Sequence, residues 1–233
     1  MTLPRRLLAE SIGSMLLAAT VIGSGVMAER LAGGNAAIAL LANTAATVAL
    51  LATLIAVLGP VSGAHFNPAV SLVQMFRGEL SGRDALGYVI VQIIGCIVGA
   101  FLAHAMFDLS ILQTSTHART GAAQWLSEIV ATGGLVLVIV SCVDAPTSAW
   151  RVAAWIGAAY WFTASTSFAN PAITLARALS NTFSGIRPAD APAFIGAQLV
   201  GALLGLYVAK LLFTSASHGA RTTPSSEARG DRL

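Results

Sequence analysis

The sequence predicts an all-α integral membrane protein in which six membrane-spanning helices and two shorter re-entrant half-helices form an inverted internal repeat. Three observations lead to this fold class. Of the 233 residues, 56% are apolar and only 10% are charged, whereas about a quarter of the residues in a soluble domain carry charge. Six segments are mostly apolar over about 20 residues, which is the length that crosses the hydrocarbon core of a bilayer. One short motif, Asn-Pro-Ala, occurs once in each half of the chain.

The six predicted spans cover residues 8–28, 35–58, 86–107, 125–143, 149–165 and 192–213. Residues 1–7 precede them as a short N-terminal segment, and residues 214–233 are rich in Ser, Thr, Gly and Arg, which predicts a disordered tail. Because the number of spans is even, both termini lie on one side of the membrane. Nine of the 13 basic residues fall on that side, so the positive-inside rule places both termini in the cytoplasm.

The remaining composition excludes several functional classes. The net charge is +3, but the basic residues are dispersed along the chain and form no patch for a nucleic acid. Cys96 and Cys142 both lie in apolar stretches, which predicts buried thiols rather than a disulfide. The sequence shows no nucleophile beside a base, no phosphate-binding loop and no cluster with metal-ligand spacing, so we expect neither an enzyme nor a cofactor or metal site.

Residues 8–213, which we expect to form one membrane domain, consist of two copies of one pattern, at about residues 8–110 and 122–213. A glutamate opens each copy, at Glu10 and Glu128, and a Gln-x-x-Gly-x-x-x-Gly pattern closes each copy, from Gln92 and from Gln198. Since each copy has three spans, the second must cross the membrane in the opposite direction. The paired glycines of the closing pattern have the spacing of close helix contacts.

Each copy also contains an apolar segment that is too short to cross the membrane, at residues 61–75 and 163–179. Asn is a favoured N-cap and Pro is favoured at the first helical position, so a half-helix should begin at Asn67 and at Asn170. The two positive N-terminal ends would meet at the membrane centre and disfavour cations, and both Asn amides would keep two N–H donors for a passing solute. Backbone carbonyls before the motifs cannot face lipid, so we expect a polar path lined by Gly63, Ala64, His65, Ser165 and Thr166.

These motifs resemble a known family. The stretches Gly63-Ala64-His65-Phe66-Asn67-Pro68-Ala69-Val70 and Phe168-Ala169-Asn170-Pro171-Ala172 are similar to the paired signature of the aquaporin, or major intrinsic protein, family. The resemblance covers about residues 7–213. It implies a right-handed helical bundle, a homotetramer with one pore per subunit, and passive conduction of water, glycerol or other small neutral solutes. It also implies that Glu10 and Glu128 brace the re-entrant loops.

The sequence departs from the family at the selectivity filter. Most members carry an Arg three residues after the second Asn, where this chain has Ile173. Counting without gaps places the other filter positions at Thr47, Ala158 and Ser167, and these small side chains predict a wide, uncharged and fairly apolar filter. Ile173 and the residues after it resemble a bacterial branch associated with arsenic resistance, which implies permeation of arsenite and glycerol and a place in the bacterial inner membrane.

Some residues allow two interpretations. Arg177, one helical turn after Ile173, either reaches back toward the filter and replaces the missing charge or extends to the outer interface and holds a loop. His65 is either a pH gate or metal ligand or a ring hydrogen-bonded behind the carbonyls, and the absence of a second ligand at metal spacing favours the latter. A water-selective channel and a proton-coupled transporter remain alternative functions, the second requiring Glu10 or Glu128 to titrate.

Overall fold

The computed structural model describes residues 1–142 and 145–213, with the side chains of residues 145–147 outside the description. The predicted tail at 214–233 therefore lies outside the described residues. The described part is helical, and its elements are α1 (Leu3–Leu31), α2 (Ala36–Ser62), α3 (Pro68–Phe76), α4 (Gly82–Met106), α5 (Ala122–Ser141), α6 (Ala145–Phe162), α7 (Pro171–Ala178), the 3-10 turn η1 (Pro188–Asp190) and α8 (Ala191–Phe213).

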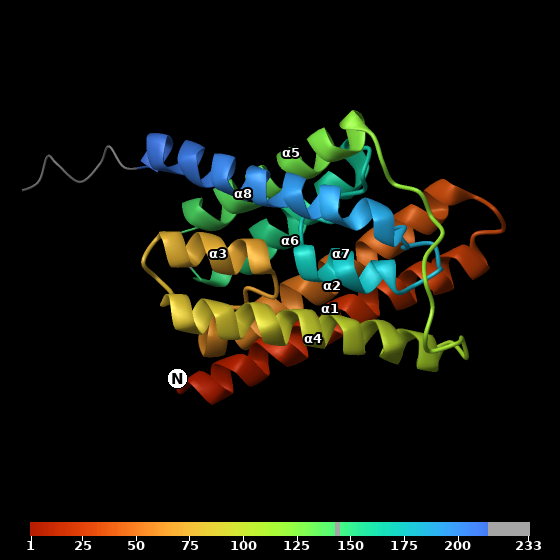
Figure 1. Ribbon diagram of the computed structural model, residues 1–233, viewed down its shortest axis with the longest axis horizontal. Coiled ribbons are helices and arrows are strands. Elements are labelled where there is room, and N and C mark those ends of the chain that lie inside the picture. The colour runs from red at the N-terminus through yellow and green to blue at the C-terminus, as the bar shows by residue number, and fades with distance from the viewer. Residues whose placement is uncertain (143–144, 214–233) are drawn as a thin grey trace, which may run out of the picture.

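The long helices occupy the positions of the predicted spans. Helices α1, α2, α4 and α5, together with the segment Pro188–Phe213, are long and apolar enough to cross a membrane. Helix α6 has 18 residues, or about 27 Å, and corresponds to the fifth predicted span. Both the start of α1 and the end of α8 lie at one end of the bundle (Figure 1), which we call the termini end; the opposite end is the far end.

Helix α1 begins at Leu3, five residues earlier than predicted. Pro4 stands in its first turn, where a missing N–H removes no helical hydrogen bond. Arg6 of this added turn forms a 3.0 Å ion pair with Asp84, which lies in the first turn of α4. The N-terminal segment is thus part of the bundle.

Each half of the chain is built around one close helix pair, α1 with α4 and α5 with α8. A Cβ atom on Gly95 or Gly99 of α4 would overlap backbone atoms of α1, and a Cβ atom on Gly201 or Gly205 of α8 would overlap backbone atoms of α5. Small residues allow helix backbones to approach closely in a membrane, where packing replaces the hydrophobic effect between helices. The repeated glycine pairs predicted from the sequence therefore hold each half of the bundle together.

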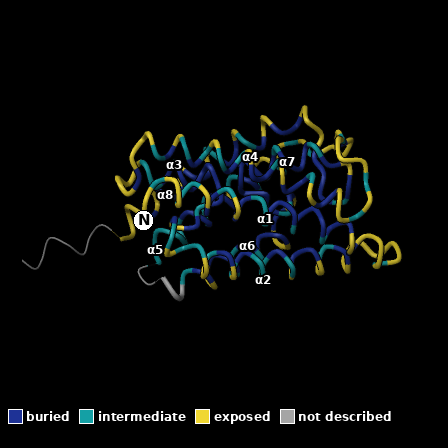
Figure 2. The backbone as a smooth tube through the Cα atoms, turned by 90° about the horizontal axis from the view of Figure 1, so that it is seen from below, coloured by how far each residue is buried: buried dark blue, intermediate teal, exposed yellow. Residues whose placement is uncertain are grey.

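The two half-helices connect the halves of the bundle. Helices α3 and α7 enter from opposite ends and meet near its centre (Figure 1). Each contacts the third long helix of both halves, α4 and α8. The core around them is buried, whereas the outward turns of the long helices are exposed (Figure 2). Exposed residues such as Leu41, Val57 and Leu211 are apolar, which suits a surface that faces lipid.

The close contact of α8 with α5 can be tested with two alanine substitutions in the same helix. Gly205→Ala places a methyl group against the α5 backbone, so we expect a loss of about 1–3 kcal/mol of stability from overpacking. Gly196→Ala is the control, because no atom lies within 4 Å of the added Cβ. Thermal unfolding of the detergent-purified protein measures both variants. Equal midpoints for the two would contradict the packing role of Gly205.

Candidate conduction pathway

A cavity of about 310 Å³ runs through the centre of the bundle between the two half-helices. Its lining begins at Gln74 and Cys142 toward the termini end, passes Asn67 and Asn170, and reaches Arg177 toward the far end. Residues of α1, α2, α3, α5, α6 and α7 contribute to this lining. Cys142 is half-buried rather than buried as predicted, since it faces this cavity; the other thiol, of Cys96, is buried, and both are free.

The two Asn-Pro-Ala motifs begin their half-helices as predicted. The Asn67 Oδ1 atom accepts from the Ala69 N–H at 2.9 Å, and the Asn170 Oδ1 atom accepts from the Ala172 N–H at 3.0 Å. Pro68 and Pro171 each occupy the first helical turn. These contacts are side-chain N-caps, which explain why both helices start at the Asn.

The same two amides also join the repeats. The Asn67 Nδ2 atom donates to the Ala169 carbonyl at 2.7 Å, and the Asn170 Nδ2 atom donates to the Phe66 carbonyl at 2.8 Å. The prediction that each Asn keeps two free N–H donors is therefore wrong, because one of them is used in this reciprocal link. One N–H on each Asn remains for a solute in the cavity that both residues line.

Two non-helical segments precede the motifs, and both have unusual backbone geometry. Ala64 and Phe66 have φ values of 51° and 48°, and Ser167 and Ala169 have φ values of 49° and 48°. Non-glycine residues seldom adopt this left-handed region, which often marks a functional site. The matching values in both repeats show that each copy places its chain in the same strained path.

In the first repeat the predicted carbonyl-bearing residues Gly63, Ala64 and His65 line the cavity. In the second repeat the lining residues are Ser167, Phe168 and Ala169, so the prediction of Ser165 and Thr166 is wrong by two to three residues. Instead, the Ser165 carbonyl accepts a hydrogen bond from the Arg119 Nη1 atom at 3.4 Å, and the Ser165 hydroxyl accepts from the Ser167 N–H at 3.2 Å. Ser165 thus supports the turn from behind.

The buried carboxylates brace these segments. Glu10 accepts from the N–H groups of His65 and Phe66 at 3.0 and 2.7 Å, and from the Ser62 hydroxyl at 2.6 Å. Glu128 accepts from the N–H groups of Phe168 and Ala169, both at 2.9 Å. Both glutamates are fully buried and neither lines the cavity. Because the carboxylates satisfy N–H groups that cannot face lipid, the segments can remain non-helical within the bundle.

A glutamine connects each carboxylate to its half-helix. The Gln92 Nε2 atom donates to Glu10 at 2.8 Å and to the Ser71 hydroxyl of α3 at 2.9 Å. In the second repeat the Gln198 Nε2 atom donates to Glu128 at 2.7 Å and to the Thr174 hydroxyl of α7 at 2.9 Å. The sequence pattern included both glutamines without indicating this role.

His65 belongs to the support of the first segment. Its Nδ1 atom lies 3.1 Å from the Ser71 hydroxyl, and its ring lies 5.2 Å from the ring of Tyr88. Among the residues that the structure describes, no group of His, Cys, Asp and Glu is arranged to hold a metal ion. This placement favours the interpretation of His65 as a hydrogen-bonded ring beside the carbonyls.

Three of the four predicted filter residues lie in the cavity lining: Thr47, Ser167 and Ile173. Ala158 does not, because it is exposed on the outside of α6. The residues of α6 that face the cavity are Val152, Ile156 and Tyr160. Counting without gaps therefore placed this filter position on the wrong face of α6. The four-residue spacing of these three larger side chains is the sequence signal that identifies the correct helix face.

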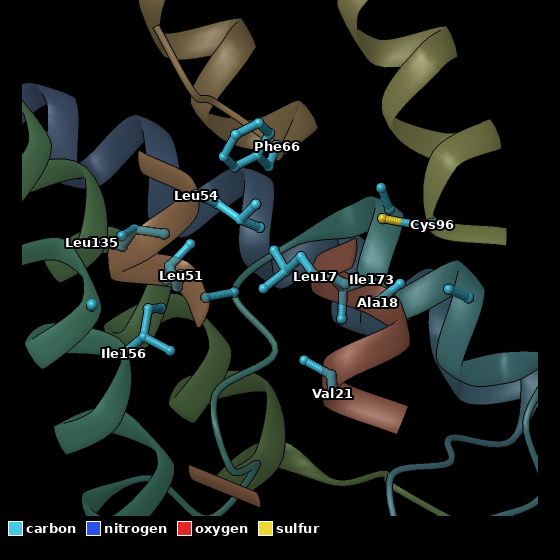
Figure 3. Packing of buried hydrophobic residues seen from close by; sticks show 14 of the residues in the cluster. Leu17, Ala18, Val21, Leu51, Leu54, Phe66, Cys96, Leu135, Ile156 and Ile173 are labelled. Carbon is cyan, nitrogen blue, oxygen red and sulfur yellow. The ribbon is translucent and has the colours of Figure 1, made fainter. Parts of the chain in front are cut away.

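Aliphatic side chains form another part of the lining. Leu51 and Ile156 lie on one side of the cavity and Leu17, Val21 and Ile173 lie on the other, as Figure 3 shows. The hydroxyl groups of Thr47 and Ser167 add no charge to the cavity lining. Thr47 donates to the Asn43 carbonyl at 2.9 Å, and the buried Ser167 hydroxyl has no hydrogen-bond partner among the described residues.

Arg177 lies at the far end of the cavity and is only 3% exposed. Its Nε atom donates to the Ser184 carbonyl, and its guanidinium stacks on the Phe168 ring at 3.3 Å from the ring centroid. It therefore holds a loop, as one interpretation predicted, and also faces the cavity, as the other predicted. A second guanidinium, that of Arg119, lies 5.2 Å from the same ring. Burial lowers the pKa of Arg119 below its usual value, while the Glu128 carboxylate opposes this effect.

Comparison with known proteins gives four matches. The family model described as "Major intrinsic protein" matches residues 1–162. A protein named aquaglyceroporin AqpS, from Rhizobium meliloti, is 55% identical over 165 residues, which cover 70% of this chain and 71% of that protein. The lens fiber major intrinsic protein of Gallus gallus is 31% identical over 97 residues, which cover 40% of this chain and 37% of that protein. The crystal structure of the aquaglyceroporin from Plasmodium falciparum has a TM-score of 0.69 at 20% identity, over 91% of this chain and 98% of that chain.

The bracing role of Glu128 predicts that Glu128→Gln destabilises the protein. The Phe168 and Ala169 N–H groups donate to different carboxylate oxygens, so an amide keeps one of these acceptors and turns an NH₂ group toward the other backbone donor. We therefore expect a loss of about 2 kcal/mol or more. Thermal unfolding in detergent measures this loss, with Glu29→Gln as a control because Glu29 is exposed. Unchanged stability of Glu128→Gln would contradict the bracing role and favour a titrating carboxylate.

The placement of α6 predicts different effects for two leucine substitutions. Tyr160→Leu shortens a side chain that lines the cavity, so we expect glycerol permeability to rise by about threefold or more. Ala158→Leu changes a residue on the outside of the helix and should leave permeability within about twofold of wild type. Light-scattering traces of proteoliposomes in a glycerol gradient give both values. A larger effect at Ala158 than at Tyr160 would show that the sequence-based position was correct.

Proposed function

The chain belongs to the major intrinsic protein family and is a membrane channel for small solutes, and we propose that it conducts neutral, hydroxyl-bearing solutes such as glycerol and arsenous acid, together with water. The absence of charge at Ile173 carries this proposal. A neutral solute can exchange its hydrogen bonds with the Asn67 and Asn170 amides and with backbone carbonyls while its less polar side passes the aliphatic residues. An ion loses more hydration than such a lining returns.

Arsenous acid suits this filter chemically. It is uncharged near pH 7 and presents hydroxyl groups in a compact, polyol-like arrangement. The resemblance of the region after Ile173 to the arsenic-resistance branch supports this choice of solute. The Rhizobium relative is named as an aquaglyceroporin, which supports glycerol-type solutes. Val152, Ile156 and Tyr160 line the cavity from α6 in place of Ala158, so we expect a filter that is uncharged but narrower than the sequence predicts.

The alternative functions have less support. A water-selective pore is expected to combine a narrow filter with a charged residue at the Ile173 position. A proton-coupled transporter needs a titratable group that the solute or proton can reach, whereas Glu10 and Glu128 are fully buried, bonded to loop N–H groups and absent from the cavity lining. A flux that follows the solute gradient alone, with no dependence on a proton gradient, would exclude the transporter.

Assembly and orientation form part of the same proposal. We expect a homotetramer with one pore in each subunit, embedded in the inner membrane of a bacterium. The excess of basic residues at the termini end supports a cytoplasmic location for that end.

The filter assignment predicts that Ile173→Arg reduces conduction of the larger solutes. A guanidinium at this position narrows the path and adds charge, so we expect glycerol and arsenous acid permeability to fall by about tenfold or more, with water permeability much less affected. Stopped-flow shrinkage of proteoliposomes and arsenite uptake measure the three rates. Ile173→Val is the matched control and should retain all of them.

If Ile173→Arg leaves glycerol and arsenous acid permeation at the wild-type level, Ile173 is not part of the filter. If the wild-type protein conducts water and excludes both larger solutes, the water-selective alternative replaces the proposed function.

A further inference from the structure

We propose that Arg177 provides the positive charge that excludes cations from this pore, from a position one helical turn beyond the filter residue Ile173. This inference rests on the proposed function, because only a conducting pathway needs such exclusion. It assigns to one side chain a role that most relatives give to an arginine at the Ile173 position.

The guanidinium of Arg177 lies beside the cavity. Arg177 and Ile173 both lie in α7, four residues apart, and both line the same cavity. A helical side chain leans toward the N-terminus of its helix, which for Arg177 means back toward Ile173 and the cavity. Its 3% exposure shows that it does not extend to the outer surface. The charge therefore lies within the protein, beside the route of a solute.

No acid forms an ion pair with the Arg177 guanidinium. Among the described residues the ion pairs are Arg6 with Asp84 and Arg187 with Asp190, so Arg177 has no acidic partner within 4.0 Å. The Glu128 carboxylate attracts it from a greater distance, and Arg119 brings a second positive charge to the same Phe168 ring. The Ser184 carbonyl and the face of the Phe168 ring stabilise the cation but leave its net charge in place. Between low-dielectric walls, an unneutralised charge repels a like charge far more strongly than it does in water.

Several contacts fix the guanidinium of Arg177 in place. The Ser184 hydroxyl donates to the Val21 carbonyl of α1 at 2.8 Å, so the loop that holds Arg177 is attached to another helix. Gly25 allows this contact, because a Cβ atom there would come within 2.5 Å of the Ser184 hydroxyl oxygen. A cation that is held in position by the fold needs no rearrangement to act on a passing ion.

Selection by size and selection by charge then occur at different positions along the pore. The side chain of Ile173 sets part of the width of the filter without charge, and Arg177 sets the electrostatic barrier without occupying the Ile173 position. The positive N-terminal ends of α3 and α7 add to the same barrier at the centre. An uncharged filter for neutral solutes is then compatible with a membrane that must not leak ions.

The test compares Arg177→Gln with the control Arg187→Gln in proteoliposomes. Arg187 lies in the same connecting loop region near the far end, with its side chain 46% exposed and paired with Asp190. We expect Arg177→Gln to raise the leak of K⁺ and protons by about tenfold or more, while glycerol flux persists. Arg187→Gln should remain as tight to cations as wild type. Ion leak is measured with an entrapped pH-sensitive dye under a K⁺ gradient, and glycerol flux by light scattering.

A second pair of variants tests the inference with Arg177 and its Ser184 contact intact. In Ile173→Glu an acid stands four residues before Arg177, the spacing and order that favour an ion pair on a helix. We expect this pair to neutralise the charge and raise the cation leak by about tenfold, whereas Ile173→Gln should stay tight.

Two results would overturn the inference. In the first, the wild-type channel conducts glycerol while Arg177→Gln and Ile173→Glu remain as tight to K⁺ and protons as their controls, and the proposed function then survives alone. In the second, the wild-type protein conducts no neutral solute, and the proposed function fails together with the inference that rests on it.

Discussion

The structure depends on how the chain satisfies backbone N–H groups in two stretches that lie inside the bundle but are not helical. Lipid offers no hydrogen bonds, so each such group needs a partner within the protein. Glu10 and Glu128 provide these partners from the neighbouring long helices, and the reciprocal bonds of Asn67 and Asn170 connect the two stretches to each other. With the N–H groups occupied and the caps in place, the half-helices meet at the centre and the remaining polar groups are available to a solute.

The two repeats place their non-helical stretches along the same backbone path but surround them with different side chains. Phe66 immediately precedes the first Asn, and its ring fills the space that a side chain on Gly13 would need. Counted from the glutamates and the Asn residues, the equivalent pair in the second repeat is Ala131 and Ala169, so a small residue replaces the ring and a methyl group replaces the glycine. The first pair carries seven side-chain carbon atoms and the second pair carries two, so the repeats share their backbone path here but not their side-chain packing.

The sequence is sufficient to predict the features that arise from local chemistry and repetition. An Asn followed by Pro begins a helix in either repeat, and a lone glutamate within an apolar span needs a partner wherever it lies. Features set by loop length or by contacts between irregular segments could not be derived in this way. Ala158 was placed by counting across a turn of unknown length, and the structure puts Tyr160 on the cavity face instead. Arg119 and Ser184 come from long connections, and the sequence gives no periodicity from which their contacts with Ser165 and Arg177 could be derived.

The displacement of the arginine by one helical turn has a physical reason. A guanidinium at the Ile173 position would restrict the path sterically and repel cations with the same group, so the width and the charge of the filter could not change independently. At position 177 the side chain is held against Phe168 and the Ser184 carbonyl, to the side of the path, while its field still acts along the cavity. Coulomb repulsion falls only gradually with distance in a low-dielectric surrounding, whereas steric exclusion ends within an ångström or so. Four helical residues rise by about 6 Å, so the charge lies about 6 Å farther outward at position 177 than it would at position 173. This shift keeps most of the electrostatic barrier to cations and removes the steric barrier to neutral solutes at the filter.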